Sequence, residues 1–464
     1  MTVKRFRTDN VRLKALTKHK SMHIGGKAMS SSGDQFEKEK APTQEPDVPC
    51  PRQLTDLPTD LLVMIACKIP PSNSFTIGVS NKIRRGINAH VLNYVEAQRN
   101  SSITSIHMQT LINVLTVATN QQVTELIEIN GFITKLVSQS QHSNTPEARQ
   151  HSALAMAKIA RLHIGIRALI QSEAIHALVD MASKDNTALA RQDIAYTMGE
   201  ILDEMDQASL LMGPVINALV SMARKEHNTP IGRGNIAVAI AKMATKSIGV
   251  TALIEACAIN DIFSMAKQEM DAPDVRQHMA FAMATIAEHD TGIAAIIEIE
   301  GSVDALVSMF GQEDNTSDEE IYIAFVLAQI AQREDGIFRL MKGNAISALA
   351  SMAIKESHDP VIRQNIALAI TRIARTRIGL EALIQTNVAI DALVSMAGPA
   401  DNAADEREYI AFAMEQIAQS KAGRFHLMKG NAIKALVSMY KLDNTIEGIA
   451  AIKSAFGQIL RPSI

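Results

Sequence analysis

The sequence predicts an all-α fold, an α-solenoid in which similar helical units stack one on another. The first observation is a recurring phrase, which reads ALVDMA at 177–182, ALVSMA at 218–223 and ALVSMF at 305–310. One leucine-like position of this phrase returns every 41 to 44 residues. Self-similarity at such a period is typical of a helical repeat array. The eight positions are Leu136, Leu178, Leu219, Ile262, Leu306, Leu349, Leu393 and Leu436.

A second observation is a coarser echo, because MKGNAI occurs at Met341 and again at Met428, two units later. The composition is the third. Of the 464 residues, 47% are hydrophobic but only 4% are aromatic, while methionine is frequent at 23 residues. Small and flexible apolar side chains favour close packing of helix on helix. Together these observations predict stacked helices rather than sheets.

The charge and the cysteine content argue against several classes of function. The formal net charge of −3 gives no general argument for binding nucleic acid or an anionic membrane. Cys50, Cys67 and Cys257 have no metal-ligand spacing, so we expect reduced thiols, no metal and no cofactor. No stretch reads as a signal peptide or a membrane span, which predicts a soluble protein. No nucleophile, phosphate-loop or metal motif is present either, and the sequence predicts no enzyme.

The first 51 residues are expected to be a disordered basic tail and linker. Residues 1–27 carry eight lysines or arginines against a single acid, Asp9. A solvated tail is the simplest interpretation, and a targeting signal or a nucleic-acid arm are the alternatives. Residues 30–51 are rich in serine, proline and mixed charge, which is typical of a linker.

Residues 52–97 predict a small helical module. Thr55 or Asp56 can cap its first helix, Pro58 suits the first turn, and Pro70-Pro71 end it. The order Leu-Pro, acid-Leu-Leu, Ile and later Val-Ser with basic residues resembles the F-box, although this chain lacks the tryptophan that often follows. The resemblance implies docking to a Skp-family adaptor of a cullin ubiquitin ligase. Its contacts would be Leu57, Pro58, Leu61, Leu62, Ile65 and Ile69. The alternative is that these residues only cap the solenoid.

Residues 98–120 are expected to form an atypical terminal capping helix, and 121–464 about eight repeats. Each repeat predicts a short helix such as 378–385, a second helix such as 387–397 and a long helix such as 363–374. The segments GSVDALVSMF, AFAMATIA and ALAITRIA resemble armadillo repeats, and some other segments resemble the related HEAT repeats. This resemblance implies a right-handed superhelix whose long helices line a concave, protein-binding face.

Armadillo proteins that bind extended peptides carry a tryptophan and an asparagine at two positions of each long helix. Along the stacked repeats, each of these positions forms a column of side chains. Neither ladder is present here, so binding of basic peptides as in import receptors is not expected. Leu154, Val238 and Leu368 stand among aromatic residues in the first column, and polar residues fill the second. We expect a folded or helical partner with apolar and acidic features. The candidate groove residues are Lys158, Tyr196, Lys242, Phe281, Phe325, Gln329, Arg372, Phe412 and Gln416. Core packing of each aromatic residue is the alternative.

Two further columns predict structural roles. Arginine opens nearly every long helix, and we expect it to bond carbonyls or acids of the neighbouring unit rather than phosphate. Glycine marks the joint between a long helix and the next short one, where it would relieve backbone strain. The arginine column is Arg149, Arg191, Arg233, Arg276, Arg363 and Arg407, interrupted by Glu320. The glycine column is Gly165, Gly249, Gly292, Gly336, Gly379 and Gly423.

Three functions remain open at this level. The first is a substrate receptor of a ubiquitin ligase, with the F-box-like module on the adaptor and a protein substrate in the groove. The second is a scaffold without any link to ubiquitin. The third, a nucleic-acid or membrane binder that uses the basic tail, is the least favoured. The first implies the cytoplasm or nucleus of a eukaryotic cell, reached in some cases as a bacterial effector delivered into the host.

Overall fold

The computed structural model describes residues 91–98, 108–142, 145–204, 212–354, 359–398, 404–442 and 445–461. These residues are helical apart from short connections, and no strand occurs among them. The chain divides into two compact units, Met1–Gln139 and Ser140–Ile464. The predictions for residues 1–90, including all six adaptor contacts of the F-box-like module, lie outside the described residues.

In unit 1 the described part is a helix over 91–98 followed by α4 (Met108–Val117), α5 (Asn120–Ile127) and most of α6 (Phe132–Gln141). A capping box starts α5: the Gln122 backbone N–H donates to Thr119 Oγ1, while the Thr119 N–H donates to Gln122 Oε1 at 2.9 Å. Leu111, Leu126 and Phe132 have no exposed surface. Their burial holds the unit's helices together.

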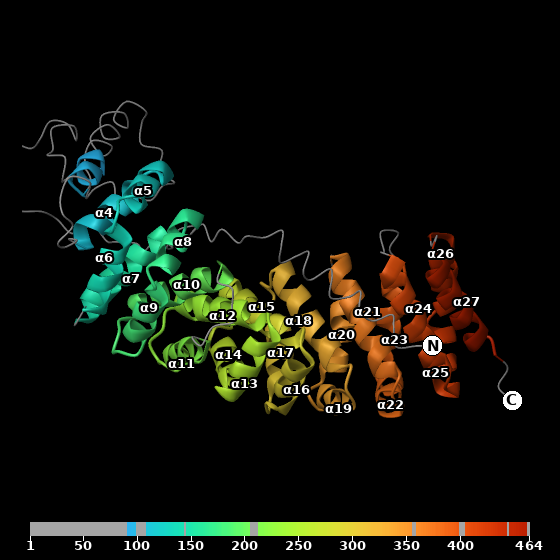
Figure 1. The fold of residues 1–464 in the computed structure, drawn as a ribbon. Helices are drawn as coiled ribbons and strands as arrows, with labels where there is room; N and C mark the ends of the chain where they lie inside the picture. The colour runs from blue at the N-terminus through green and yellow to red at the C-terminus, as the bar shows by residue number, and fades with distance from the viewer. Residues whose placement is uncertain are drawn as a thin grey trace, which may run out of the picture. The chain divides into compact units, whose positions relative to one another are not determined.

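Unit 2 is a solenoid of helical repeats, and the repeats that are described in full consist of a short, a second and a long helix, as predicted (Figure 1). The short helices are α8 (His163–Gln171), α13 (Ser247–Glu255), α16 (Asp290–Glu298), α19 (Glu334–Lys342), α22 (Arg377–Gln385) and α25 (Lys421–Lys429). The second helices are α9 (Ala174–Ala182), α11 (Met212–Ala223), α14 (Ala258–Gln268), α17 (Ser302–Phe310), α20 (Ala345–Ile354), α23 (Asn387–Met396) and α26 (Ala432–Leu442). The long helices are α7 (Pro146–Ile159), α10 (Ala188–Glu204), α12 (Pro230–Ala244), α15 (Pro273–Ala287), α18 (Ser317–Ile330), α21 (Pro360–Ala374), α24 (Ala404–Ala418) and α27 (Ile446–Ile459).

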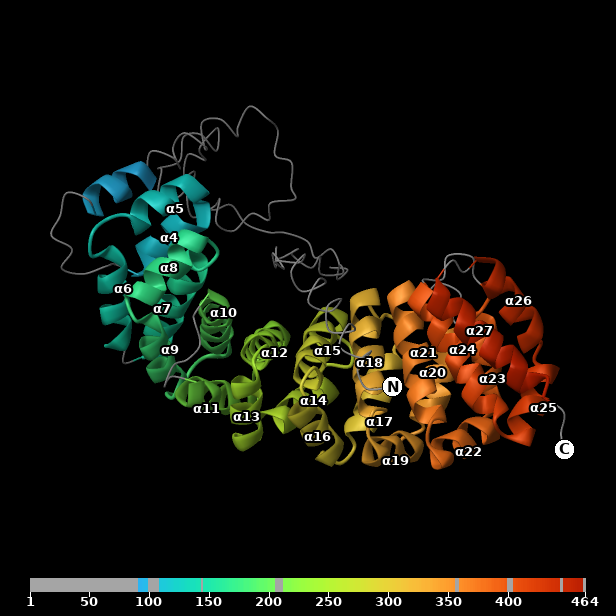
Figure 2. The same ribbon diagram turned by 45° about the vertical axis from the view of Figure 1, so that its right-hand side comes forward.

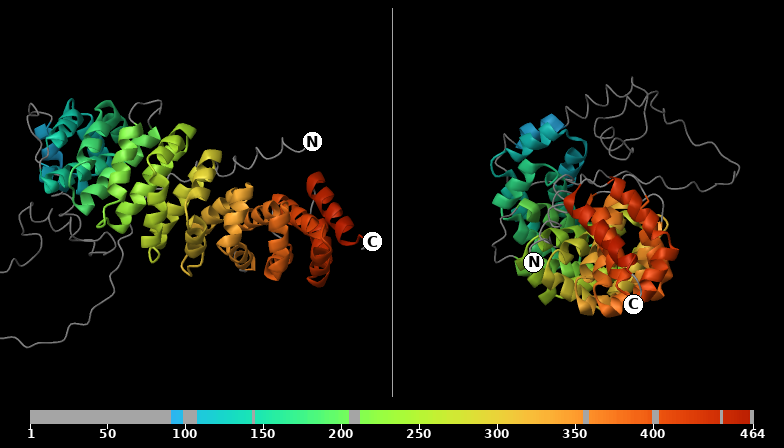
Figure 3. Two further views of the ribbon diagram at one scale, coloured as in Figure 1. Left: turned by 90° about the horizontal axis from the view of Figure 1, so that it is seen from below. Right: turned by 90° about the vertical axis from the view of Figure 1, so that its right-hand side faces the viewer.

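Like helices pack on like helices in chain order. Each long helix contacts the next long helix, and the second helices form a row of their own. Within unit 2 the long helices from α12 to α27 lie in one row, and the short helices α13, α16, α19, α22 and α25 lie along the opposite, outer edge (Figure 2). Seen from below, the repeats follow one another in chain order (Figure 3). The recurring ALVSMA phrases form the second helices, so the predicted fold class is confirmed.

Local chemistry explains where the long helices begin. The side chains of Thr145 and Thr229 accept from backbone N–H groups of the first turn, and proline follows each of them. The threonine oxygen caps the helix, and the proline after it has no backbone N–H that would lack a partner in the first turn. On α21, Ile366, Ile370 and Ile373 are buried together with the alanines of the helix and form its apolar stripe. Small alanines allow neighbouring long helices to approach closely.

The glycine column has a different cause from the one predicted. None of its members has a positive φ, so backbone strain is not what selects glycine here. A Cβ at Gly292 would lie 2.0 Å from the carbonyl oxygen of Ile286, and at Gly249 equally close to that of Met243. Each short helix therefore begins directly against the end of the preceding long helix, and only glycine leaves room for that carbonyl.

Left-handed backbone occurs one joint later, between the short and the second helix. The residues there include Gly301, but also Glu173, Cys257, Asn344 and Asn431, with φ between 55° and 74°. Asparagine and glycine tolerate this conformation, whereas glutamate and cysteine adopt it less readily. Because the residue type varies between repeats, this joint leaves no uniform pattern in the sequence.

Candidate functional site

The first predicted groove column runs along the inner row of long helices, one side chain from each helix. Leu154, Tyr196, Val238, Phe281 and Phe412 are half-buried. Phe325 on α18 and Leu368 on α21 are each only 4% exposed. The column therefore presents apolar surface from α7 to α15 and again at α24, and little at α18 and α21 between them. Partly exposed aromatic side chains on a rigid scaffold are suited to contact another protein.

Phe281 is also held by its neighbour. Its ring lies 5.3 Å from the ring of Tyr322 on α18, with an angle of 54° between the planes. A tilted aromatic pair at this separation is a favourable geometry. Phe281 thus packs between adjacent long helices and keeps part of its surface exposed, which combines the two roles that the sequence left open.

The second column differs from the prediction at Lys242. The sequence suggested a basic flank that would attract an acidic partner. In the structure Lys242 Nζ lies 3.0 Å from Glu200 Oε1 and 3.5 Å from Asp203 Oδ2, both on α10. Its charge is balanced inside the array, and the ion pair joins α10 to α12.

Arg372 requires a similar correction. Its side chain is 8% exposed, and Nη1 donates to the backbone carbonyl of Ala328 on α18 at 2.6 Å. Gln329, one residue beyond that carbonyl, is equally buried. A guanidinium held in this way fastens α21 to α18, so it does not extend from the surface as a basic contact. Lys158 and Gln416 remain half-buried, and Gln416 Oε1 accepts from Gln419 at 2.9 Å.

Charges lie close together at the end of the groove that contains α10. Burial raises the pKa of Asp193 to about 6, although Lys158 and Arg161 act to lower it. Burial and then the charge of Glu200 raise the pKa of Tyr196 to about 12, so its hydroxyl stays protonated at neutral pH. This region offers a phenol and mixed charges beside apolar surface.

The arginine column performs the predicted structural role. Arg149 Nε donates to Asn186 Oδ1 at 2.8 Å, and Arg191 Nε donates to Asn228 Oδ1 at 2.6 Å, in each case to the loop before the next long helix. Arg276 is fully buried and pairs with Glu319 at 3.0 Å, and Arg363 pairs with Glu406 at 2.8 Å. These side chains are therefore engaged between repeats.

A glutamine beside the arginine completes a contact that the sequence analysis missed. Thr187 Oγ1 donates to Gln150 Oε1 at 2.8 Å, and Thr229 Oγ1 donates to Gln192 Oε1 at 2.7 Å. The same pair recurs from Thr316 to Gln277 at 3.0 Å. An Arg-Gln dipeptide in one long helix thus recognises an Asn-Thr dipeptide before the next. We call this arrangement the Arg-Gln latch. Its signal was available, since the two dipeptides recur 37 to 39 residues apart.

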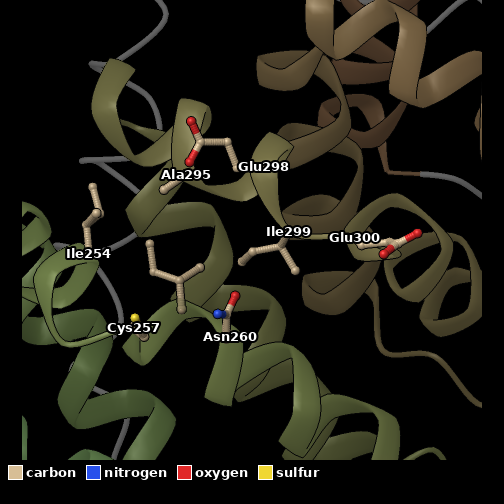
Figure 4. A pocket seen from close by; sticks show the side chains of 8 residues that line it. Ile254, Cys257, Asn260, Ala295, Glu298, Ile299 and Glu300 are labelled. Atoms are coloured by element: carbon tan, nitrogen blue, oxygen red, sulfur yellow. The ribbon is translucent and has the colours of Figure 1, made fainter.

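A cavity of about 520 Å³ opens between the α13–α14 joint and the α16–α17 joint, away from the predicted groove residues (Figure 4). Ile254, Ile259 and Ile299 supply apolar lining, with the carboxylates of Glu298 and Glu300 beside them. Cys257 also lines it, but no histidine is among the eight lining residues, so the pair needed to activate a thiol is missing there. The remaining lining residues are Asn260 and Ala295.

Metal centres and membrane-spanning helices are two other kinds of site to consider within the described residues. No group of three or more metal-ligating side chains is found within that part of the chain. No single described helix is long and apolar enough to cross a membrane, although two sharply bent helix pairs meet the length and composition criteria together.

Comparison with known proteins gives the fold. No protein-family model matches the chain, and no curated protein matches it. An engineered protein of known structure aligns over 87% of this chain and 99% of its own, with 16% identity and a TM-score of 0.64. A structure from work on a phosphorylation switch that controls the interaction between cadherin and β-catenin covers 86% of both chains, with 12% identity and a TM-score of 0.64. A designed armadillo-repeat protein aligns over 53% of this chain and 99% of its own, with 19% identity but a TM-score of only 0.44. At these identities, the two alignments with a TM-score of 0.64 show the fold alone, an α-solenoid of armadillo-like repeats.

Proposed function

We propose that this protein is a non-catalytic scaffold that binds another protein along the inner row of long helices in unit 2. The observation that carries the proposal is the column of half-buried apolar side chains, above all Tyr196, Phe281 and Phe412. These side chains lie on α10, α15 and α24, so a partner segment that contacts all three would extend across several repeats. The similar structure studied for the cadherin–β-catenin interaction supports protein binding by analogy of fold.

The chemistry of the groove narrows the partner. Lys242 and Arg372 are engaged within the array, which leaves apolar, aromatic and amide groups as the main surface there. Near α10, Asp193 adds a partly buried carboxyl group and Lys158 adds a half-buried amine. The proposed ligand is therefore a largely apolar protein segment, and the acidic character expected from the sequence is less important.

The groove is tested by affinity purification of the full chain from eukaryotic cells. We expect partners of the wild-type chain to be lost from a Tyr196→Ala, Phe281→Ala, Phe412→Ala variant. The control is Leu189→Ala with Ile231→Ala, which removes exposed apolar side chains from the first turns of α10 and α12. If both variants keep the same partners as the wild type, the groove is not the binding surface.

A second proposal is that the protein is the substrate receptor of a Skp-cullin-F-box ubiquitin ligase. It rests on the order of residues 57–85 in the sequence and would place the protein in the cytoplasm or nucleus of a eukaryotic cell. Purified Skp adaptor should bind the full chain, and Leu61→Ala with Leu62→Ala should weaken binding by about 1–3 kcal/mol or more. The groove variant should bind the adaptor normally. Absence of adaptor binding would reject the ligase role and leave the scaffold proposal intact.

A further inference from the structure

The outer edge of unit 2 carries an unpartnered apolar row. Phe338 on α19 is 63% exposed, Ile378 on α22 is 58% exposed, and Phe425 on α25 is 61% exposed. These three short helices are consecutive neighbours and lie side by side in both views (Figures 1 and 2). Large exposed apolar side chains on adjacent helices are unusual for a surface with no binding role.

The three side chains share one face. Phe338 and Phe425 each stand two residues after the glycine in the first turn of their helix, whereas Ile378 stands one residue before its glycine. These positions are three residues apart, and residues three apart lie on the same side of a helix. Met428, three residues after Phe425 and 50% exposed, extends that face.

The row ends abruptly at α16. The equivalent positions of that helix hold Thr291 and Ala294, while Ile248 on α13 is again 60% exposed. Among the described short helices, exposed apolar side chains occur on three consecutive neighbours at α19, α22 and α25, whereas Ile248 on α13 has no such counterpart on α16. This arrangement provides a matched control.

The charge around the apolar row differs from one end to the other. The α25 segment carries Lys421, Arg424, His426 and Lys429 without an acidic residue. On α22, Arg377 is paired with Glu381, and α19 carries acids as well as bases. The α25 end of the row is therefore basic, and it is complementary to negative charge at one end of a partner.

We propose that this row binds an amphipathic helix that lies across α19, α22 and α25. Packed helices are about 10 Å apart, and residues seven apart in a helix are separated by about 10 Å along its axis. A partner helix with an apolar residue at every seventh position would thus meet Phe338, Ile378 and Phe425 in turn. The basic residues of α25 call for acidic residues at the end that lies over that helix. This surface is separate from the inner groove.

The test uses a displayed library of helical peptides of about 21 residues, which is three heptads. Selection against the full chain should enrich peptides with apolar residues at heptad spacing and acids at one end. Substituting Phe338→Ser, Ile378→Ser and Phe425→Ser together should weaken the enriched peptides about 10-fold or more, whereas Ile248→Ser should leave binding unchanged. Since all four side chains are exposed, circular dichroism should show the wild-type fold in both variants.

Two results would overturn the proposal. One is selection that yields no heptad pattern, or peptides that bind the triple variant as tightly as the wild type. The other comes from vesicles of phosphatidylcholine and phosphatidylserine. If these vesicles bind the wild type, do not bind the triple variant and are not displaced by the enriched peptides, the row contacts a lipid surface instead of a helix.

Discussion

The two sides of α18 are joined to their neighbours by different chemistry. Toward α15, Arg276 is buried against Glu319, and Thr316 donates to Gln277, so the step has a complete Arg-Gln latch. Toward α21, the corresponding positions of α18 hold Glu320 and Ile321, and the latch cannot form. Arg372 of α21 reaches back instead and donates to the carbonyl of Ala328.

The comparison teaches that the array needs one polar fastening between neighbouring long helices more than it needs a fixed residue for it. Apolar contact alone leaves adjacent repeats free to slide, because alanine and isoleucine surfaces have little directional preference. A guanidinium hydrogen bond supplies direction. In the α18–α21 step this hydrogen bond comes from Arg372, which belongs to the predicted groove column.

The largest expected effect comes from breaking the latch side of α18. Arg276→Met leaves the buried Glu319 carboxylate without its partner, which should lower the free energy of unfolding of that region by about 3–5 kcal/mol. Burial raises the pKa of Glu319 to about 7 even though Arg276 lowers it, so the loss should be larger at pH 8 than at pH 5.5, where the carboxyl takes a proton. Hydrogen exchange of α15 and α18 measures the change.

The control for Arg276 is a second substitution. Arg276→Met combined with Glu319→Leu removes both charges and should recover most of the stability, because no unpaired group remains buried. A single variant that loses less than about 1 kcal/mol would show that the buried pair contributes little to this step.

The next effect concerns the glycine column and applies to each repeat that carries one of its glycines. Gly292→Ala places a Cβ 2.0 Å from the Ile286 carbonyl oxygen and should cost about 1–3 kcal/mol, as overpacking does. Gly457→Ala, in the last described long helix, meets nothing within 4 Å and should stabilise by about 0.5–1 kcal/mol. Chemical denaturation of the two variants compares them. Equal effects would mean that the close approach at Gly292 relaxes without cost.

These cases show which parts of the structure could be predicted from the sequence. The period of Leu178, Leu219 and Leu306 predicts the second helices because each unit repeats the same burial pattern. The column of glycines was recognised for the same reason, but its cause is contact with a carbonyl of the previous helix, which no local pattern reveals. Arg372 occupies a groove position by alignment, and only the absence of a latch at Glu320 and Ile321 explains its different role.

Without Arg372, the contact between α18 and α21 has neither the latch nor the hydrogen bond that replaces it. This contact should then be less stable than the intact contact between α15 and α18. Arg372→Met leaves the buried Ala328 carbonyl without this donor and should cost about 1–3 kcal/mol. Exchange should increase in α18 and α21 and remain unchanged in α10 and α12. Lys242→Met is the control, since it breaks a half-exposed ion pair and should cost about 0–1 kcal/mol. The reverse ranking would mean that Arg372 does not fasten this step.

The smallest effect sharpens the comparison at the other end of the groove, where Asp193 is partly buried. Because burial raises its folded-state pKa from 3.8 to about 6, its ionisation opposes folding, and stability should fall as the pH rises from about 4 to 6. Asp193→Asn removes that dependence, so the variant should equal the wild type near pH 4 and exceed it above pH 7 by on the order of 1 kcal/mol. Denaturation at the two pH values measures the difference. If the wild type is instead the more stable at high pH, Lys158 and Arg161 stabilise the carboxylate by more than burial costs it, and the charges at this end of the array act as a further fastening between α7 and α10.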